Sequence, residues 1–211
     1  MPEIVIPGPE GRLEARYHKG PELNSPLCIV LHPHPRQGGT MNNKIVYNTY
    51  QAFKKSDFST LRFNFRGVGR SQGTYDNGLG ELTDAAAALD WLQTENPSAR
   101  TTWIAGFSFG AWLALQLLMR RPEISGFVAI SPPASLYDFS FLAPCPSSGL
   151  IIQGTEDKIV QEEIVTELVE KLNKQNSINI DYKKINGADH FYSKSLDDIH
   201  NKIKKYIKKN I

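Results

Sequence analysis

Apolar residues follow two alternating patterns along the chain from about residue 26 onwards. Some stretches are continuously apolar or alternate strictly, as strands in a covered sheet do, whereas others carry apolar residues at helical spacing. The predicted strands span residues 27–31, 60–65, 102–107, 127–130, 150–153 and 178–185. The predicted helices span residues 45–55, 82–92, 111–119, 162–172 and 196–209.

Two short β-rich pieces precede this alternation, at residues 3–6 and 13–17, and the turn-forming segment 7–11 between them predicts a hairpin. Alternating strands and helices predict an α/β fold, with a mostly parallel sheet, helices on both faces and right-handed crossovers. The hairpin adds an antiparallel edge at the N-terminus. In open sheets of this kind ligands bind beyond the carboxyl ends of the strands, so residues that directly follow a strand are the candidates for chemistry.

The composition is that of an ordinary globular protein, with 40% hydrophobic and 22% charged residues among 211. This length fits a single domain over residues 1–211. The 24 basic and 22 acidic residues give a net charge of +2, which argues against a nucleic-acid partner. The basic run at residues 202–209 has apolar residues at helical spacing, so we interpret it as a helix with a solvated lysine face; contact with an anionic surface is the alternative.

The two cysteines and the N-terminal segment indicate whether the chain binds a metal and where in the cell it lies. Cys28 lies in an apolar run and Cys145 in a proline-flanked loop, and neither has a partner at metal-ligand spacing. The N-terminus shows no basic segment followed by an apolar one, and no apolar run is long enough to cross a bilayer. We therefore expect a cytoplasmic protein with no metal and no membrane association. The sequence does not indicate an oligomeric state.

A candidate nucleophile lies in the segment Gly106–Gly110, which reads G-F-S-F-G between a predicted strand and a predicted helix. This is the context of a nucleophile elbow, in which the serine takes a strained backbone angle and glycines two residues away on each side permit the tight turn. The N-terminus of the following helix favours a developing anion. We therefore predict that Ser108 is a nucleophile; a serine that merely caps a tight strand–helix turn is the alternative.

A serine hydroxyl needs a base to take its proton, and His190 is the best candidate among five histidines. In nucleophile-elbow enzymes the chain order is serine, acid, histidine, and only His190 and His200 follow Ser108. His200 lies within a predicted helix, whereas His190 lies in a loop directly after the strand at 178–185. That position is at the carboxyl edge of the sheet.

The acid that orients the histidine should also follow a strand, and Asp157 follows the strand at 150–153. It would fix the imidazole tautomer and stabilise the imidazolium without itself being protonated. Glu156 is the second candidate because it is the neighbouring residue, whereas Asp189 is too close to His190 in sequence for good geometry. Asp157 as a simple helix N-cap is the structural alternative.

Acyl transfer also needs two backbone N–H groups aimed at the developing oxyanion. Phe109, directly after the nucleophile, supplies one, and the loop after the first parallel strand supplies the other. That loop contains Pro33 and Pro35, which have no N–H, so His34 is the predicted donor. His32 and His34 lack a third ligand, so we do not interpret them as a metal site.

With these residues assigned, the chain resembles the α/β-hydrolase superfamily over nearly its whole length. The resemblance is greatest to small lidless bacterial serine hydrolases and esterases that are related to dienelactone hydrolases. Dienelactone hydrolases use a cysteine nucleophile where this chain has Ser108, which argues against a dienelactone substrate. The segments that carry the resemblance are 32–35, 38–39, 63–71, 106–110, 154–160 and 187–190.

Many members of this superfamily insert a lid after the strand that here ends near residue 130. The connection at 131–149 is too short for a lid domain. Its aromatic residues Tyr137 and Phe139, together with His32, are expected to wall a shallow substrate pocket. A lidless site predicts activity on short activated esters and little on long-chain lipid.

These inferences predict a serine hydrolase that cleaves a small-molecule ester through an acyl-enzyme on Ser108, without a cofactor. A peptidase or a thioesterase with the same three residues is an alternative that the sequence does not separate, because leaving-group preference depends on pocket shape. A catalytically idle binding module of the same fold is the non-enzymatic alternative.

Overall fold

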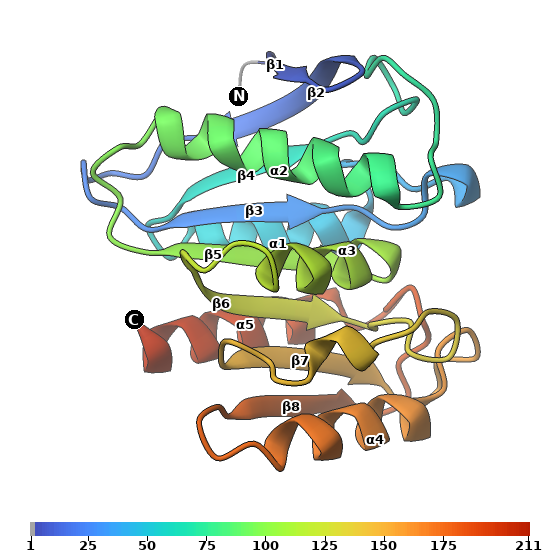
Figure 1. The fold of residues 1–211 in the computed structure, drawn as a ribbon. Coiled ribbons are helices and arrows are strands. Elements are labelled where there is room, and N and C mark those ends of the chain that lie inside the picture. The colour runs from blue at the N-terminus through green and yellow to red at the C-terminus, as the bar shows by residue number, and fades with distance from the viewer. Residues whose placement is uncertain (1–2) are drawn as a thin grey trace.

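The computed structural model describes residues 3–211, which form an eight-stranded sheet with helices on both faces (Figure 1). From one edge to the other, the strands are β1 (Glu3–Gly8), β2 (Gly11–His18), β4 (Ser59–Phe63), β3 (Leu27–Leu31), β5 (Thr102–Phe107), β6 (Ile124–Ile130), β7 (Gly149–Gly154) and β8 (Ile180–Ile185). The hairpin β1–β2 is antiparallel, and β2 joins β4 antiparallel. The pairings from β4 through to β8 are parallel, which confirms the predicted fold class.

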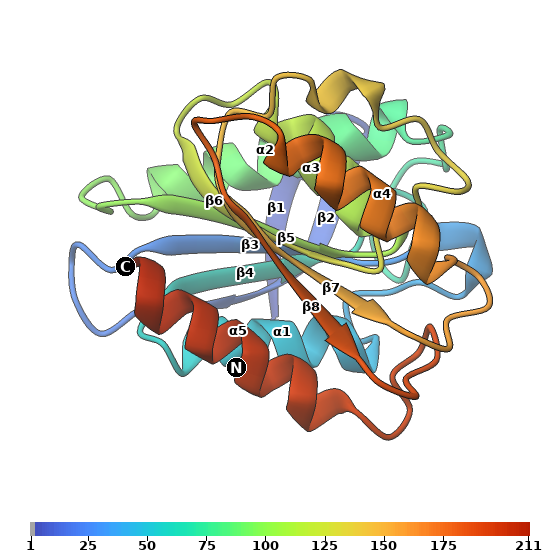
Figure 2. The same ribbon diagram turned by 90° about the horizontal axis from the view of Figure 1, so that it is seen from below.

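The helices divide between the two faces of the sheet, as Figure 2 shows. One face carries α1 (Lys44–Lys54) and α5 (Leu196–Asn210), and the other carries α2 (Leu79–Thr94), α3 (Phe109–Leu118) and α4 (Glu162–Asn173). Short 3₁₀ turns, η1 (Pro35–Gln37) and η2 (Ser140–Leu142), lie in the loops after β3 and β6. The central strands are buried along both faces, so each face of the sheet has its own apolar core.

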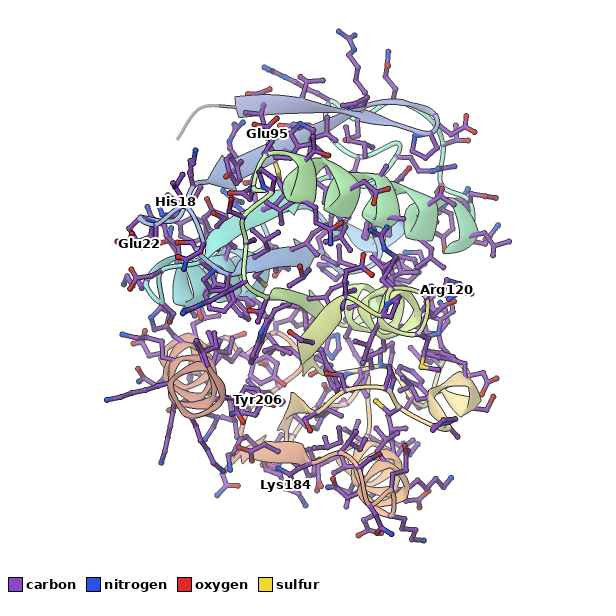
Figure 3. The ribbon with its side chains drawn as sticks, turned by 60° about the vertical axis from the view of Figure 1, so that its left-hand side comes forward. His18, Glu22, Glu95, Arg120, Lys184 and Tyr206 are labelled. Carbon is purple, nitrogen blue, oxygen red and sulfur yellow. The ribbon has the colours of Figure 1, made fainter. Side chains whose placement is uncertain are left out.

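The basic C-terminal segment forms α5, and its apolar residues pack inward as the helical spacing predicts. Ile199, Ile203, Tyr206 and Ile207 are buried, and the Tyr206 ring meets that of Trp103 edge-on, with 5.8 Å between ring centres. Figure 3 labels Tyr206 beside α5, on the side of the helix that faces the sheet. The lysines at 204, 205, 208 and 209 are exposed. Burial of the apolar stripe therefore accounts for the position of this helix.

Several element boundaries differ from the sequence prediction, and three of these differences have a local reason. The strand β4 ends at Phe63 rather than at residue 65, because the Phe65 N–H turns to donate to His32 Nε2. The helix α2 begins three residues early, at Leu79, where Glu81 accepts hydrogen bonds from the N–H groups of Asp76 and Gly78. The helix α3 begins at Phe109, immediately after the turn at Ser108.

The connection between β6 and β7 carries no lid domain, as predicted. It contains only η2 and packs against α3, where the Tyr137 ring stacks on that of Trp112 with 4.3 Å between centres. In the described part of the chain, no helix combines the length and the apolar character that crossing a membrane would require.

Candidate active site

Three polar side chains meet at the carboxyl edge of the parallel strands, which point the same way in Figure 1. Ser108 follows β5, Asp157 follows β7 and His190 follows β8. Ser108 Oγ lies 3.1 Å from His190 Nε2, and His190 Nδ1 lies 2.7 Å from Asp157 Oδ2. The fold therefore brings the predicted nucleophile, base and acid into one hydrogen-bonded chain, although 82 residues separate the serine from the histidine.

Ser108 occupies a strained turn between β5 and α3. Its φ of 53° and ψ of −121° lie in a region that non-glycine residues rarely adopt. The Ser108 N–H donates to the carbonyl of Ile130 at 2.8 Å, which ties the turn to β6. A side chain at Gly106 would collide with the Gly110 carbonyl, and a Cβ at Gly110 would lie 2.5 Å from the Leu31 carbonyl oxygen. Both glycines are therefore required for the close approach of the turn to β3 and α3.

We expect Gly110→Ala to destabilise the fold by about 2–3 kcal/mol, because the backbone of β3 must move to admit the methyl group. The urea midpoint of unfolding measures this change. Gly38→Ala is the control: Gly38 has a φ of 76° but nothing within 4 Å of its Cβ position, so the cost should be about 1 kcal/mol. Equal losses for the two variants would contradict the steric explanation.

The carboxylate of Asp157 has a hydrogen-bond donor on every side. Its Oδ1 accepts from the N–H groups of Ile159 at 2.9 Å and Val160 at 2.8 Å, and its Oδ2 accepts from His190. Burial opposes the charge, but the hydrogen bonds from His190 and from the two backbone N–H groups outweigh it and hold the pKa of Asp157 below its ordinary value. An ionised Asp157 requires the proton of a neutral His190 to sit on Nδ1, which leaves Nε2 as an acceptor facing Ser108.

The other candidates for base and acid lie elsewhere. The side chain of Glu156 is exposed, and the residue contributes its N–H to the Ala188 carbonyl. Asp189 accepts from the N–H and hydroxyl of Ser193. His200 lies in α5 beside the backbone of Asn48. None of these three side chains has a hydrogen bond to His190 or Ser108 among the described residues.

Tyr192 anchors the loop that carries His190 to the interior of the protein, a role that could not be predicted from the sequence. Tyr192 is fully buried, and its hydroxyl lies 2.8 Å from Ser131 Oγ at the end of β6. Both residues have positive φ angles, 50° for Tyr192 and 44° for Ser131. The His190 ring itself packs on that of Phe107, with 5.1 Å between ring centres. A tyrosine two residues after a loop histidine gave no sequence signal for this contact.

Ser108 and His190 open into a cavity of about 150 Å³ that His34 and Phe109 also line. Phe109 is the first residue of α3, so its N–H has no acceptor within the helix. The His34 ring is fixed on both sides: Nδ1 accepts from the Arg36 N–H at 3.2 Å, and Nε2 lies 3.0 Å from the Tyr75 hydroxyl. The two residues predicted to supply the oxyanion N–H groups therefore line the cavity into which Ser108 opens.

Only one of the three side chains expected to wall the pocket lines this cavity. Tyr137 does so, whereas His32 and Phe139 are not among its lining residues. His32 is fully buried: Nε2 accepts from the Phe65 N–H at 3.0 Å and Nδ1 donates to the Pro33 carbonyl at 2.7 Å. Burial lowers the pKa of His32 to about 4, so this neutral ring braces the loop after β3. Phe139 is buried in the core on the α2–α4 face.

Other side chains form the rest of the wall, in which the titratable residues are His34, Tyr137 and His190. Leu136, Ile159 and Phe191 line the cavity and are 62%, 45% and 58% exposed, so they form an apolar rim between the cavity and solvent. Among the residues that the structure describes, no Asp, Glu, Lys or Arg lines the cavity. Within residues 3–211, no three His, Cys, Asp or Glu side chains gather in a way that could hold a metal ion.

Residues 18–144 match the model of the X-Pro dipeptidyl-peptidase (S15) family. A 56% identical relative, an uncharacterized protein of Rickettsia prowazekii, aligns over 98% of this chain and 89% of its own length.

Two solved structures share the fold of this chain over nearly its whole length. An α/β hydrolase of unknown function from Agrobacterium tumefaciens is 54% identical, with a TM-score of 0.96 over 99% of this chain and 95% of that one. A lidless α/β serine hydrolase from Xanthomonas campestris is 32% identical, with a TM-score of 0.88 over 99% and 94% of the two chains. The chain therefore belongs to the X-Pro dipeptidyl-peptidase (S15) family of the α/β-hydrolase superfamily and is a serine hydrolase.

Proposed function

We propose that this serine hydrolase cleaves small, uncharged carboxylic esters through an acyl-enzyme on Ser108. The observation that carries the proposal is the hydrogen-bonded chain from Ser108 through His190 to Asp157, which opens into an uncharged cavity. Its geometry fits general-base activation of a serine, with nucleophile and base within hydrogen-bond reach and the base oriented by a third group.

The proposed reaction has two halves. His190 Nε2 takes the Ser108 proton while Oγ attacks the ester carbonyl, and the backbone N–H groups of Phe109 and His34 receive the oxyanion. The C–O bond to the leaving group then breaks, and His190 gives its proton to the departing alcohol. In the second half His190 takes a proton from water, the hydroxide attacks the acyl-enzyme, and the carboxylic acid leaves as Ser108 regains its proton.

The lining of the cavity favours an ester over the N-terminal dipeptide that the family name describes. A dipeptidyl-peptidase must recognise the protonated amino terminus of its substrate, and a buried ammonium group needs a carboxylate partner. Asp157 is already paired with His190, and Glu156 and Asp189 line a second cavity, which shares Ile159, His190 and Phe191 with the first. An uncharged acyl group has no such requirement and matches the apolar rim.

Labelling with a fluorophosphonate probe, followed by mass spectrometry, tests the nucleophile. We expect a single phosphonylated site, at Ser108. An ester panel then tests the substrate class: kcat/KM should be highest for p-nitrophenyl acetate and butyrate and fall by at least about tenfold for p-nitrophenyl palmitate, because the open site holds a long chain poorly. Gly-Pro-p-nitroanilide should be a poor substrate.

Two outcomes would contradict the proposal. A folded protein that takes no label would favour the idle binding module, and faster cleavage of Gly-Pro-p-nitroanilide than of any ester would favour a peptidase. The apolar rim offers a further control, because Phe191→Ala should raise KM for the butyrate more than for the acetate and leave labelling intact.

A further inference from the structure

Gln153 is a buried polar residue that the proposed mechanism does not use. It lies in β7, one residue before the strand ends, and its side chain is fully buried. Its Nε2 lies 3.1 Å from Asp157 Oδ2 and 2.8 Å from the carbonyl oxygen of Val160. Its Oε1 has no hydrogen-bond partner among residues 3–211. A buried acceptor without a partner is costly and rare, so its presence calls for an explanation.

The orientation of this amide is fixed by its neighbours. Asp157 Oδ2 and the Val160 carbonyl are both acceptors, so they require the NH₂ group of Gln153 to face them. Turning the amide over would place Oε1 against two oxygens and leave the NH₂ group without an acceptor. An apolar residue of the same size would avoid the unpaired Oε1, so packing alone gives no reason for glutamine here.

We infer that Gln153 is a positioning residue that holds the Asp157 carboxylate in the plane and charge state that His190 needs. This inference rests on the proposed function, because it assigns Gln153 a role in the same catalytic chain. Asp157 Oδ1 is held by the loop N–H groups of Ile159 and Val160. Asp157 Oδ2, the oxygen that accepts a hydrogen bond from His190 Nδ1, also accepts one from the buried Gln153 amide.

Loss of the Gln153 amide has two physical consequences. The carboxylate is then held less firmly against rotation about its Cβ–Cγ bond, which misaligns His190 with Ser108 and slows the chemical step. The charge on Oδ2 is also less compensated, so it attracts a proton on His190 more strongly. The acid side of the kcat/KM profile is therefore expected to move to higher pH.

The test variant is Gln153→Met, which keeps the length of the side chain and removes the amide. We expect kcat for p-nitrophenyl acetate to fall roughly tenfold with KM changed by less than about twofold. The midpoint on the acid side of the kcat/KM profile should rise by about 0.5 pH unit. Gln175→Met is the control, because the Gln175 side chain also makes a hydrogen bond to the backbone, its Oε1 accepting from the Cys145 N–H, and among the described residues no hydrogen bond joins it to Ser108, Asp157 or His190.

A purely structural role would lower the melting temperature of Gln153→Met and leave its kcat and its pH midpoint at the native values, and that result would overturn the inference. Should this variant not fold, NMR of the native protein decides. The side-chain amide resonances of Gln153 should shift with pH at the midpoint of the kcat/KM profile, and resonances that do not respond to pH would overturn the inference. Failure of the phosphonate to label Ser108 would instead remove the proposed function and leave the NMR titration interpretable.

Discussion

His190→Ala is expected to lower kcat/KM for p-nitrophenyl acetate by at least about 10⁴-fold, because members of a catalytic triad act as a unit. His190 Nε2 is the nitrogen base within hydrogen-bond distance of Ser108 Oγ, at 3.1 Å. Without it the hydroxyl has no acceptor for its proton, and the leaving alkoxide has no donor. Phosphonate labelling should slow with turnover, because the probe also requires an activated serine.

His200→Ala is the matched control for this variant. His200 is the other histidine that follows Ser108 in the chain, and it lies in α5 beside the backbone of Asn48. We expect its replacement to change kcat/KM by less than about twofold. A large loss for His200→Ala together with a small one for His190→Ala would reverse the assignment of the base.

The order of the elements could be predicted from the sequence because each strand and helix carries its own local signal. The apolar run of β3 and the glycine spacing around Ser108 are fixed by constraints within a few residues. The chain order of serine, acid and histidine then limited the base to two positions. Candidates at strand ends could be assigned because all parallel strands of one sheet place their carboxyl ends at the same edge.

The interior of the site could not be predicted, because its contacts join distant segments. His32 and His34 are two residues apart in a repeated His-Pro pattern, and the Phe65 N–H, 33 residues away, fixes the first of them inside the core. Phe139 and Tyr137 are both aromatic residues of the same loop, yet Phe139 is buried in the core whereas Tyr137 lines the cavity. Gln153 marks the end of an apolar run, which gives no indication of its contact with Asp157.

The residues of the candidate site lie partly inside and partly outside the segment that matches the family model. The match to the S15 model covers residues 18–144 and so includes Ser108 and the loop at His34, but it ends before Asp157 and His190. The half of the site outside the match also supplies Ile159 and Phe191, which separate the cavity from Glu156 and Asp189. Differences in substrate from the peptidase that names the family are therefore expected to arise in this second half.

Asp157→Asn is expected to lower kcat by about 10⁴-fold, because the amide imposes the wrong tautomer on His190. The N–H groups of Ile159 and Val160 donate to one oxygen of this side chain, so the asparagine oxygen should occupy that position. Its NH₂ group then faces Nδ1 of His190 and makes that nitrogen an acceptor. The imidazole proton moves to Nε2, which can no longer take the proton of Ser108.

The same substitution should change the pH dependence of stability. The pKa of Asp157 in the folded protein is below its ordinary value of 3.8, so the ionised carboxylate stabilises the fold above that pH. This contribution is lost as pH falls through the lowered folded-state pKa. The difference in urea midpoint between the native protein and Asp157→Asn should therefore stay constant well above pH 3.8 and shrink as the pH falls through that value and below it. Glu156→Gln removes the neighbouring exposed carboxylate and should leave kcat within about twofold of native; a loss there as large as that of Asp157→Asn would transfer the role of the acid to Glu156.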